Sequence, residues 1–360
     1  VAFGDSITEG HPPYDDRGGY PSRLESLLRR EDREVEVRNR GLGGETTSEG
    51  LSRLPGVLAE GGDVLLLMEG SNDVSLIVTG ELSPETVIAN LAAMGSRAKQ
   101  AGFGVVLATI IPRGPHTSRD QNNGATFGLD LEIRDLAYRR RDPLVEGWEV
   151  FFHHLRPYST IYYDGPEDDV GHPNAEGFDV LAAAFADVLQ GRDTMWPVIG
   201  EFLPNPFLDP EVRPGQIFEV TVYDFGTGLE RTASTLTLND VVVATDAAGN
   251  PGRQLLSHTS DATTVTCFAR LGVLAVDRND PPNRLDSRVA DYEVQGGSYR
   301  RSDVNRDCRV DGRDVVTLGR VFGLPRGELG FDSDFDVNGD GRLDGDDLAA
   351  IARTFGLVSF

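Results

Sequence analysis

The sequence predicts a chain of three parts, in which an α/β domain with a parallel sheet precedes a small all-β domain and a helical module. Over residues 1–195, apolar strand-like runs alternate with amphipathic helical stretches, which is the rhythm of a parallel sheet covered on both faces. Residues 196–298 contain short alternating runs between Gly, Asn and Asp turns, and residues 299–360 contain an internal repeat. A chain of 360 residues is long enough for two or three such domains.

Charge and hydropathy limit the classes of partner. The formal net charge is −24, because 58 Asp and Glu outnumber 34 Lys and Arg, so phosphate would be repelled over most of the surface and we discount a nucleic-acid role. No apolar run approaches the length that crosses a bilayer, which excludes a membrane span. The cysteines, Cys267 and Cys308, are too few for a disulfide framework, and their redox state stays open.

The elements of the first domain follow in order from this alternation. Strands are expected at residues 1–3, 35–37, 64–68, 105–111 and 150–152. Helices are expected at residues 20–30, 47–60, 84–101, 129–141 and 175–189. Loops at the carboxyl ends of parallel strands form the usual ligand crevice of an open sheet. Chemically active side chains should therefore come directly after strands.

Two motifs follow the first two expected strands. In Gly4-Asp5-Ser6-Ile7-Thr8, a serine at the end of a strand can project its hydroxyl into the crevice, beside backbone N–H groups that favour negative charge. The ordinary alternative for such a serine is a helix N-cap. The segment 39–47, Asn-Arg-Gly-Leu-Gly-Gly-Glu-Thr-Thr, is rich in glycine, so its backbone can approach a ligand and point an N–H at an oxyanion. Its ordinary alternative is a tight turn.

Two further motifs follow later strands. Gly70-Ser71-Asn72-Asp73 follows the most apolar strand, and Asn72 could donate its side-chain N–H to an oxyanion, although an Asx-capped turn is the ordinary alternative. Asp169 and His172 lie three residues apart before the last helix of the domain. A carboxylate at that spacing can hold the imidazole tautomer that accepts a proton from a serine. A purely structural histidine is the alternative.

Together the four motifs resemble the SGNH (GDSL) hydrolase family over roughly the first 195 residues. The resemblance implies a flavodoxin-like parallel sheet and a serine esterase that needs no catalytic cofactor. By the same resemblance, Ser6 is the nucleophile, His172 is the general base and then acid, and Asp169 orients His172. The implied oxyanion donors are the backbone N–H groups of Ser6 and Gly44 and the side-chain amide of Asn72. Two positions, Ser71 and Glu45, depart from common family residues, and neither is expected to carry the chemistry.

The second domain is predicted to be a small β-sandwich. After a proline-rich connection over residues 197–214, strand-like alternation appears at residues 218–222 and 235–238. Residues 224–229 and 236–239 show a weak similarity to bacterial immunoglobulin-like modules. The sequence does not indicate a role for this domain.

The C-terminal repeat has the spacing of calcium loops. Residues of the segment 303–324 recur 33 positions later, so that Asp303 corresponds to Asp336 and Phe322 to Phe355. Oxygen ligands at alternating positions, with a carboxylate closing the loop at position 12, are typical of Ca²⁺ sites. We therefore expect two structural Ca²⁺ ions, with the backbone carbonyls of the two arginines among the ligands: Asp303, Asn305, Asp307, Arg309, Asp311 and Asp314 in the first loop, and Asp336, Asn338, Asp340, Arg342, Asp344 and Asp347 in the second.

This paired loop-and-helix pattern resembles a type I dockerin over about the last 60 residues. The resemblance implies a cohesin-bearing scaffold as partner, although a calcium-stabilised cap on the chain's own sandwich is an alternative. Cys308 replaces the usual glycine at position six, which should weaken the first site. Because dockerins and millimolar calcium belong outside the cell, we expect an extracellular or cell-surface protein, with no signal peptide visible in this chain.

These expectations combine into one leading function. The chain is expected to be a secreted carboxylic ester hydrolase that removes acetyl groups from a polysaccharide or acts on a small ester. A lipase, an arylesterase or a thioesterase would use the same residues. A surface binding or scaffold protein with an inactive catalytic domain is the alternative of another class. The sequence does not fix acyl-chain preference or oligomeric state.

Overall fold

The computed structural model describes most of the chain, and its contacts divide it into two compact units. The first comprises residues 1–201, 223–228 and 278–283, and the second comprises residues 202–222, 229–277 and 284–360. The domain boundaries expected near residues 195 and 298 stay predictions. The described residues are 1–10, 18–30, 34–113, 122–152, 172–204, 211–230, 233–244, 248–261, 268–294, 302–304, 309–326, 331 and 335–356.

The first unit contains a five-stranded sheet in which every neighbouring pair of strands is parallel. Its strands are β1 (Ala2–Gly4), β2 (Asn39–Gly41), β3 (Val64–Met68), β4 (Gly104–Ala108) and β5 (Leu144–Val145), in the order β2-β1-β3-β4-β5. Gly4 at the end of β1 is in register with Gly41 of β2 and with Met68 of β3. The carboxyl ends of these three strands therefore lie side by side, and the first three sequence motifs meet there.

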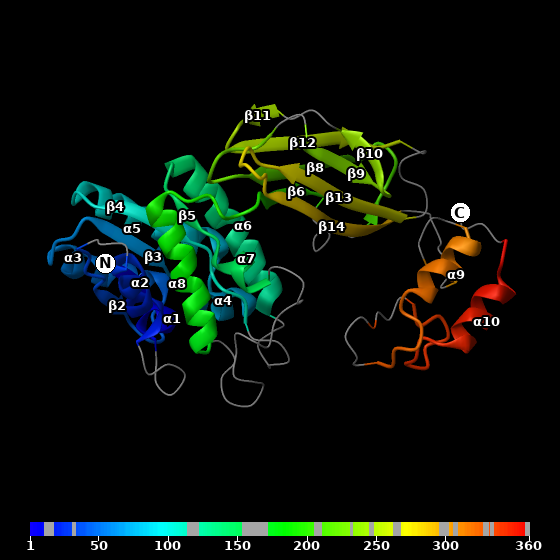
Figure 1. The fold of residues 1–360 in the computed structure, drawn as a ribbon, viewed down its shortest axis with the longest axis horizontal. Coiled ribbons are helices and arrows are strands. Elements are labelled where there is room, and N and C mark those ends of the chain that lie inside the picture. The colour runs from blue at the N-terminus through cyan, green and yellow to red at the C-terminus, as the bar shows by residue number, and fades with distance from the viewer. Residues whose placement is uncertain are drawn as a thin grey trace. The chain divides into compact units, whose positions relative to one another are not determined.

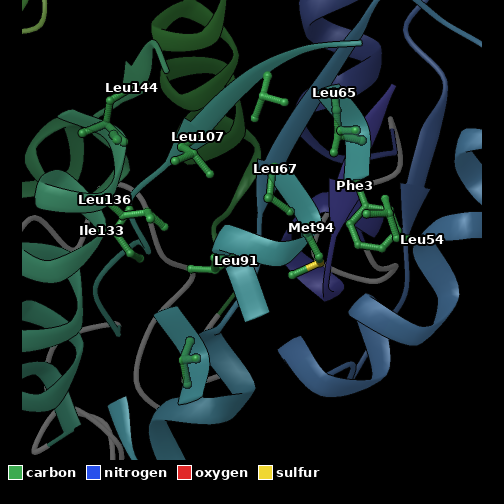
Figure 2. Close-up of a cluster of buried hydrophobic side chains, with 14 of the residues drawn as sticks. Phe3, Leu54, Leu65, Leu67, Leu91, Met94, Leu107, Ile133, Leu136 and Leu144 are labelled. Carbon is green, nitrogen blue, oxygen red and sulfur yellow. The ribbon is translucent and has the colours of Figure 1, made fainter. Parts of the chain in front are cut away.

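Helices cover both faces of this sheet, which confirms the predicted α/β fold (Figure 1). On one face, α3 (Thr47–Leu58), α5 (Pro84–Gln100) and α6 (Asn123–Arg140) pack on Leu65 and Leu67 of β3, as Figure 2 shows. On the other face, α2 (Gly19–Arg29) and α8 (Ala175–Gln190) pack on Leu66 and Met68. Successive β3 side chains thus enter opposite cores, which is why this strand is apolar throughout.

Two of the expected strands were wrong. Residues 35–37 form no strand, and the chain pairs with β1 only from Asn39. Val35 and Val37 are partly buried against the core that α2 and α8 cover. They are therefore apolar because they pack on this core, and not because they pair in a β-sheet. Residues 150–152 end the helix α7 (Gly147–Phe152) instead, and the strand is the short β5 before it. Short apolar runs do not distinguish a strand from a buried helical turn.

Two short helices begin at the Ser6 and Asn72 motifs, and the N-cap of the first is Asp5 and not Ser6. The first, α1 (Ser6–Glu9), has Asp5 as its N-cap, whose carboxylate accepts a hydrogen bond from the Ile7 N–H at 2.9 Å. The second, α4 (Ser71–Val78), follows Gly70, whose φ of 127° favours glycine. Ser6 and Asn72 therefore stand in first helical turns, where backbone N–H groups have no intrahelical acceptor.

The β-rich part of the chain lies mostly in the second unit, and it confirms the all-β expectation for that part. One sheet has the order β10-β9-β13-β14-β7 and the other β11-β12-β8-β6. Buried aliphatic and aromatic side chains line both sheets, such as Val220 and Leu271. The immunoglobulin-like fold stays a prediction. The strands are β6 (Val198–Leu203), β7 (Glu211–Val212), β8 (Ile217–Tyr223), β9 (Thr235–Leu238), β10 (Val241–Ala244), β11 (Ala248–Asn250), β12 (Arg253–Thr259), β13 (Phe268–Val276) and β14 (Arg284–Val294).

The C-terminal segment is helical and follows the sequence repeat. Its helices are α9 (Gly312–Gly319) and α10 (Gly345–Arg353). Its small core consists of three repeat-related pairs, which are Val304 with Val337, Val310 with Leu343, and Leu318 with Ile351. None of the helices in the described part of the chain is long and apolar enough to cross a membrane.

Candidate active site

Ser6 and His172 meet at the carboxyl edge of the parallel sheet. The Ser6 Oγ lies 2.7 Å from the His172 Nε2, although the two residues are 166 positions apart. Ser6 opens α1, and His172 lies two residues before Asn174, the N-cap of α8. A neutral imidazole at this distance can accept the hydroxyl proton and so convert a weak nucleophile into a strong one. Asp169, the expected third member, lies outside the described residues.

The three expected oxyanion donors lie on neighbouring elements beside Ser6. The Ser6 N–H belongs to the first turn of α1. Gly44 is exposed with a φ of 79°, and among the described residues its N–H has no hydrogen-bond acceptor. The Asn72 amide donates one N–H to the carbonyl of Glu45 at 2.8 Å. A carboxamide has two such hydrogens, so its second N–H is left for a ligand.

Glycines allow these elements to approach each other. A side chain at Gly4 would place its Cβ 2.0 Å from the carbonyl oxygen of Met68 and 2.3 Å from the Thr8 hydroxyl. At Gly41 a Cβ would lie 2.1 Å from the Glu9 nitrogen. Both positions require glycine because the opposing atoms include rigid backbone. The Leu42 N–H donates to the Gly4 carbonyl at 2.9 Å, which joins the loop after β2 to the end of β1.

Buried carboxylates connect the motifs to one another. Asp73 accepts hydrogen bonds from the N–H of Thr47 at 2.9 Å and from its hydroxyl at 2.6 Å, so the start of α4 is bound to the start of α3. Asp5 caps α1, and burial raises its pKa. Glu69 is buried, and neither of its oxygens has a hydrogen-bond partner among the described residues. Burial raises the pKa of Glu69 well above its usual range, and the nearby Asp5 and Glu45 raise it further.

Arg53 is a residue of this edge that the sequence did not reveal. Its Nε donates to the Glu45 Oε1 at 2.6 Å, and its Nη2 contacts the Glu45 Oε2. Arg53 and Glu45 are eight positions apart, across a loop and the first turns of a helix, and no periodic pattern relates residues in that way. Glu45 was not expected to carry chemistry, yet its carbonyl binds one of the expected oxyanion donors.

The second acidic loop brings three carboxylates together, two of which are among the expected Ca²⁺ ligands. Asp340, Asp344 and Asp346 offer carboxylate oxygens that lie within 4.8 Å of one another. One oxygen of Asp336 is buried and has no hydrogen-bond partner in the described part of the chain. Asp344 and Asp347 form a capping box at the start of α10. An all-oxygen donor set with a buried, unsatisfied carboxylate oxygen fits a hard cation such as Ca²⁺, although Asp346 was not among the expected ligands.

The first acidic loop is described only in part. Asn305 and Asp307 lie outside the described residues, whereas Asp303 is buried and Arg309 is exposed. Asp311 and Asp314 form the same capping box at α9 that their counterparts form at α10. The two loops therefore enter their helices in the same way.

Comparisons with known proteins identify both ends of the chain. Residues 2–180 match the GDSL-like lipase/acylhydrolase family, and residues 301–356 match the dockerin type I domain. An arylesterase of Vibrio mimicus is 33% identical over 111 residues, which are 31% of this chain and 53% of that protein. The chain thus spans about half the length of this curated relative.

Solved structures similar to this chain include two enzymes. A lipase/acylhydrolase from Enterococcus faecalis is 23% identical and covers 53% of this chain and 94% of its own, with a TM-score of 0.46. An acetylxylan esterase from Geobacillus stearothermophilus is 22% identical and covers 52% of this chain and 92% of its own, with a TM-score of 0.44. The family matches and the sheet-edge geometry agree on one description: this chain contains a GDSL-like lipase/acylhydrolase domain and, at its other end, a type I dockerin domain.

Proposed function

We propose that this chain is a serine carboxylic ester hydrolase that works through an acyl-enzyme. The contact between the Ser6 Oγ and the His172 Nε2 is the observation that supports this most. His172 accepts the Ser6 proton as the oxygen attacks the ester carbonyl, and the tetrahedral oxyanion forms beside Ser6, Gly44 and Asn72. His172 then protonates the leaving alcohol. Water repeats the sequence on the acyl-enzyme, and Asp169 holds the imidazole in the required tautomer.

We also propose a carbohydrate substrate and an extracellular setting. The match of residues 301–356 to the dockerin type I domain supports a cohesin-bearing scaffold as partner. A secreted enzyme on such a scaffold would act on polysaccharide, so acetyl groups on sugar hydroxyls are the proposed substrate class. Small esters would be cleaved by the same residues.

The acidic loops are proposed to hold two structural Ca²⁺ ions. Bound Ca²⁺ would supply positive charge that offsets the repulsion among the loop carboxylates. In the second loop, Asp336, Asn338, Asp340, Asp344 and Asp347 would hold the ion with the carbonyl of Arg342. In the first loop, the equivalent set is Asp303, Asn305, Asp307, Asp311 and Asp314 with the carbonyl of Arg309. No cofactor is proposed for catalysis.

A fluorophosphonate probe followed by an ester panel tests this function. The probe should label Ser6 in the wild type and nothing in the Ser6→Ala variant. p-Nitrophenyl acetate should be cleaved faster than longer acyl esters, and acetate should be released from acetylated xylan. Preference for long acyl chains or thioesters would favour a lipase or thioesterase instead. An unlabelled wild type without activity would favour the non-catalytic binding protein.

A further inference from the structure

We propose that the Glu45–Arg53 ion pair positions two of the oxyanion donors, Gly44 and Asn72. The inference rests on the proposed ester hydrolysis and assigns a positioning role to residues that do not touch the substrate. It starts from the burial of the pair: the Glu45 side chain is only 1% exposed, and that of Arg53 is 26% exposed. A carboxylate so deeply buried needs a fixed partner, and Arg53 engages both of its oxygens.

The backbone of Glu45 forms hydrogen bonds to the turn that contains Gly44 and to the side chain of Asn72. Its N–H donates to the Leu42 carbonyl at 3.2 Å, which closes the turn that contains Gly44 in its left-handed conformation. Its carbonyl accepts the hydrogen bond from the Asn72 amide at 2.8 Å. A shift of Glu45 therefore moves the Gly44 N–H. It also breaks the hydrogen bond that holds the Asn72 amide with its second hydrogen available for the oxyanion.

Arg53 is in turn fixed to the strands that lead into the site. Its guanidinium lies 4.1 Å from the ring centroid of Phe3, three residues before Ser6 on β1. Its Nη2 also donates to the carbonyl of Arg40 in β2 at 3.0 Å. The planar guanidinium makes all of these contacts together, whereas a lysine ammonium offers neither the paired geometry nor the flat face. The ion pair thus connects β1, β2 and α3 to the turn after β2.

Neighbouring acidic groups explain why this pair needs an arginine. The carboxyl carbon of Glu69 and the Oε2 of Glu45 each lie 3.5 Å from the position of a Cβ on Gly50 in α3. Asp5, Glu45 and Asp73 all act electrostatically on Glu69, and Arg53 is the positive group that opposes them. Loss of Arg53 would leave Glu45 as a buried charge in acidic surroundings, so its carboxylate would turn toward solvent.

The experiment compares Arg53→Lys and Glu45→Gln with a matched control, Arg40→Lys. Arg40 forms the same kind of bidentate contact with Glu60, with nitrogen–oxygen distances from 2.6 to 3.2 Å, but on the exposed side of the sheet edge. With p-nitrophenyl acetate, kcat should fall about 10-fold to 100-fold in both test variants, because misplaced donors weaken transition-state binding. KM should change little, since the donors act on the oxyanion and not on the bound ester.

The measurements distinguish positioning of the oxyanion donors from a general effect on folding. They also distinguish a failure of this inference from a failure of the proposed function. Thermal unfolding and labelling of Ser6 by fluorophosphonate should show that Arg53→Lys and Glu45→Gln are folded, and Arg40→Lys should keep wild-type kcat. A wild-type kcat in Arg53→Lys overturns the inference and leaves the ester hydrolase intact. A rise in KM with unchanged kcat, or an equal loss in Arg40→Lys, also overturns it. A wild type that is neither labelled nor active overturns the proposed function and this inference together.

Discussion

Carboxylates gather in two regions of this chain, and the two regions differ in the burial and the partners of these carboxylates. At the sheet edge, Asp5, Glu45, Glu69 and Asp73 are all at most 3% exposed. In the second acidic loop, Asp340 and Asp346 are exposed and lie with Asp344 as a group of close oxygens. The same residue types are thus fully buried at the sheet edge, whereas in the loop buried carboxylates such as Asp336 lie beside exposed ones.

At the sheet edge, groups of the chain bind three of these four carboxylates, whereas neither oxygen of Glu69 has a hydrogen-bond partner among the described residues. Arg53 binds Glu45, the Thr47 N–H and hydroxyl bind Asp73, and the Ile7 N–H binds Asp5. In the loop, much of the hydrogen bonding instead connects the loop's own backbone to its carboxylates, such as the Gly341 N–H to Asp336. Such bonds shape a loop but add no positive charge. The comparison thus sets an edge that contains an arginine and a carboxyl of raised pKa against a loop for which we propose a bound ion.

The largest effect should come from removing the nucleophile. Ser6→Ala should lower kcat on p-nitrophenyl acetate by about 10⁴-fold to 10⁶-fold, because the oxyanion donors alone leave only a small residual rate. Calcium-dependent unfolding should not change, since the replacement of serine by alanine alters no charge. A variant that keeps more than a hundredth of the activity would exclude Ser6 as the nucleophile, and steady-state kinetics beside fluorophosphonate labelling decides this.

Chelation should affect the loop region and spare the sheet edge. Removing Ca²⁺ should unfold the C-terminal module, because an ion at about 1,000 times its dissociation constant stabilises the folded state by about 4 kcal/mol. Its small core of three apolar pairs cannot replace that contribution. Limited proteolysis and calorimetry with and without EGTA should show one transition lost, while ester hydrolysis stays at its initial rate. Equal loss of activity would show that the catalytic edge depends on the ion as well.

A single oxyanion donor should matter less than the nucleophile. Asn72→Ala should lower kcat about 100-fold to 1,000-fold, which is the usual effect of losing one preorganised donor. The unfolding transition should move little, since Asn72 is only partly buried. Ser75→Ala, at a partly buried position one turn later in α4, is the matched control. Unchanged turnover in Asn72→Ala would remove this side chain from the oxyanion hole.

How much the sequence predicts depends on how local the physical signal is. Ser6, Gly44 and Asn72 follow strands whose ends adjoin in the sheet, so motif order and strand order together predict that they converge. The repeat likewise predicts the equivalent cores and helix starts of the C-terminal module. Their catalytic and metal-binding roles stay predictions.

The remaining features depend on packing that a pattern does not encode. Arg53 pairs with Glu45 across a loop, and the aromatic ring that Arg53 contacts, Phe3, lies on the distant strand β1. The helix α7 looks like a strand because its apolar residues are few and consecutive. Glu69 was not singled out, since its neighbours along the chain do not reveal that it is buried beside three other carboxylates.

The smallest expected effect is a dependence of the free energy of unfolding on pH that arises from the ionisation of Glu69. Burial raises its pKa well above the usual value of 4.5, and Asp5, Glu45 and Asp73 add to that effect. Above about pH 4.5 the folded protein therefore keeps a proton that the unfolded chain releases. The free energy of unfolding then falls as pH rises toward the folded pKa, by about 1.4 kcal/mol per pH unit from this group.

Glu69→Gln removes this dependence because an amide does not ionise. Relative to wild type, the variant should gain stability as the pH rises from 4 to 8 and should show no such gain below pH 4. Urea unfolding of both proteins at pH 4 and at pH 8 measures this difference. The control is Glu60→Gln, an exposed carboxylate whose pKa is lowered by Arg40, so its difference from wild type should change weakly and with the opposite sign. A difference for Glu69→Gln that is the same at both pH values would mean that Glu69 titrates alike in the folded and unfolded chain. In that case the sheet edge would not hold a neutral carboxyl, and its charges would need a partner from outside, as the loop does.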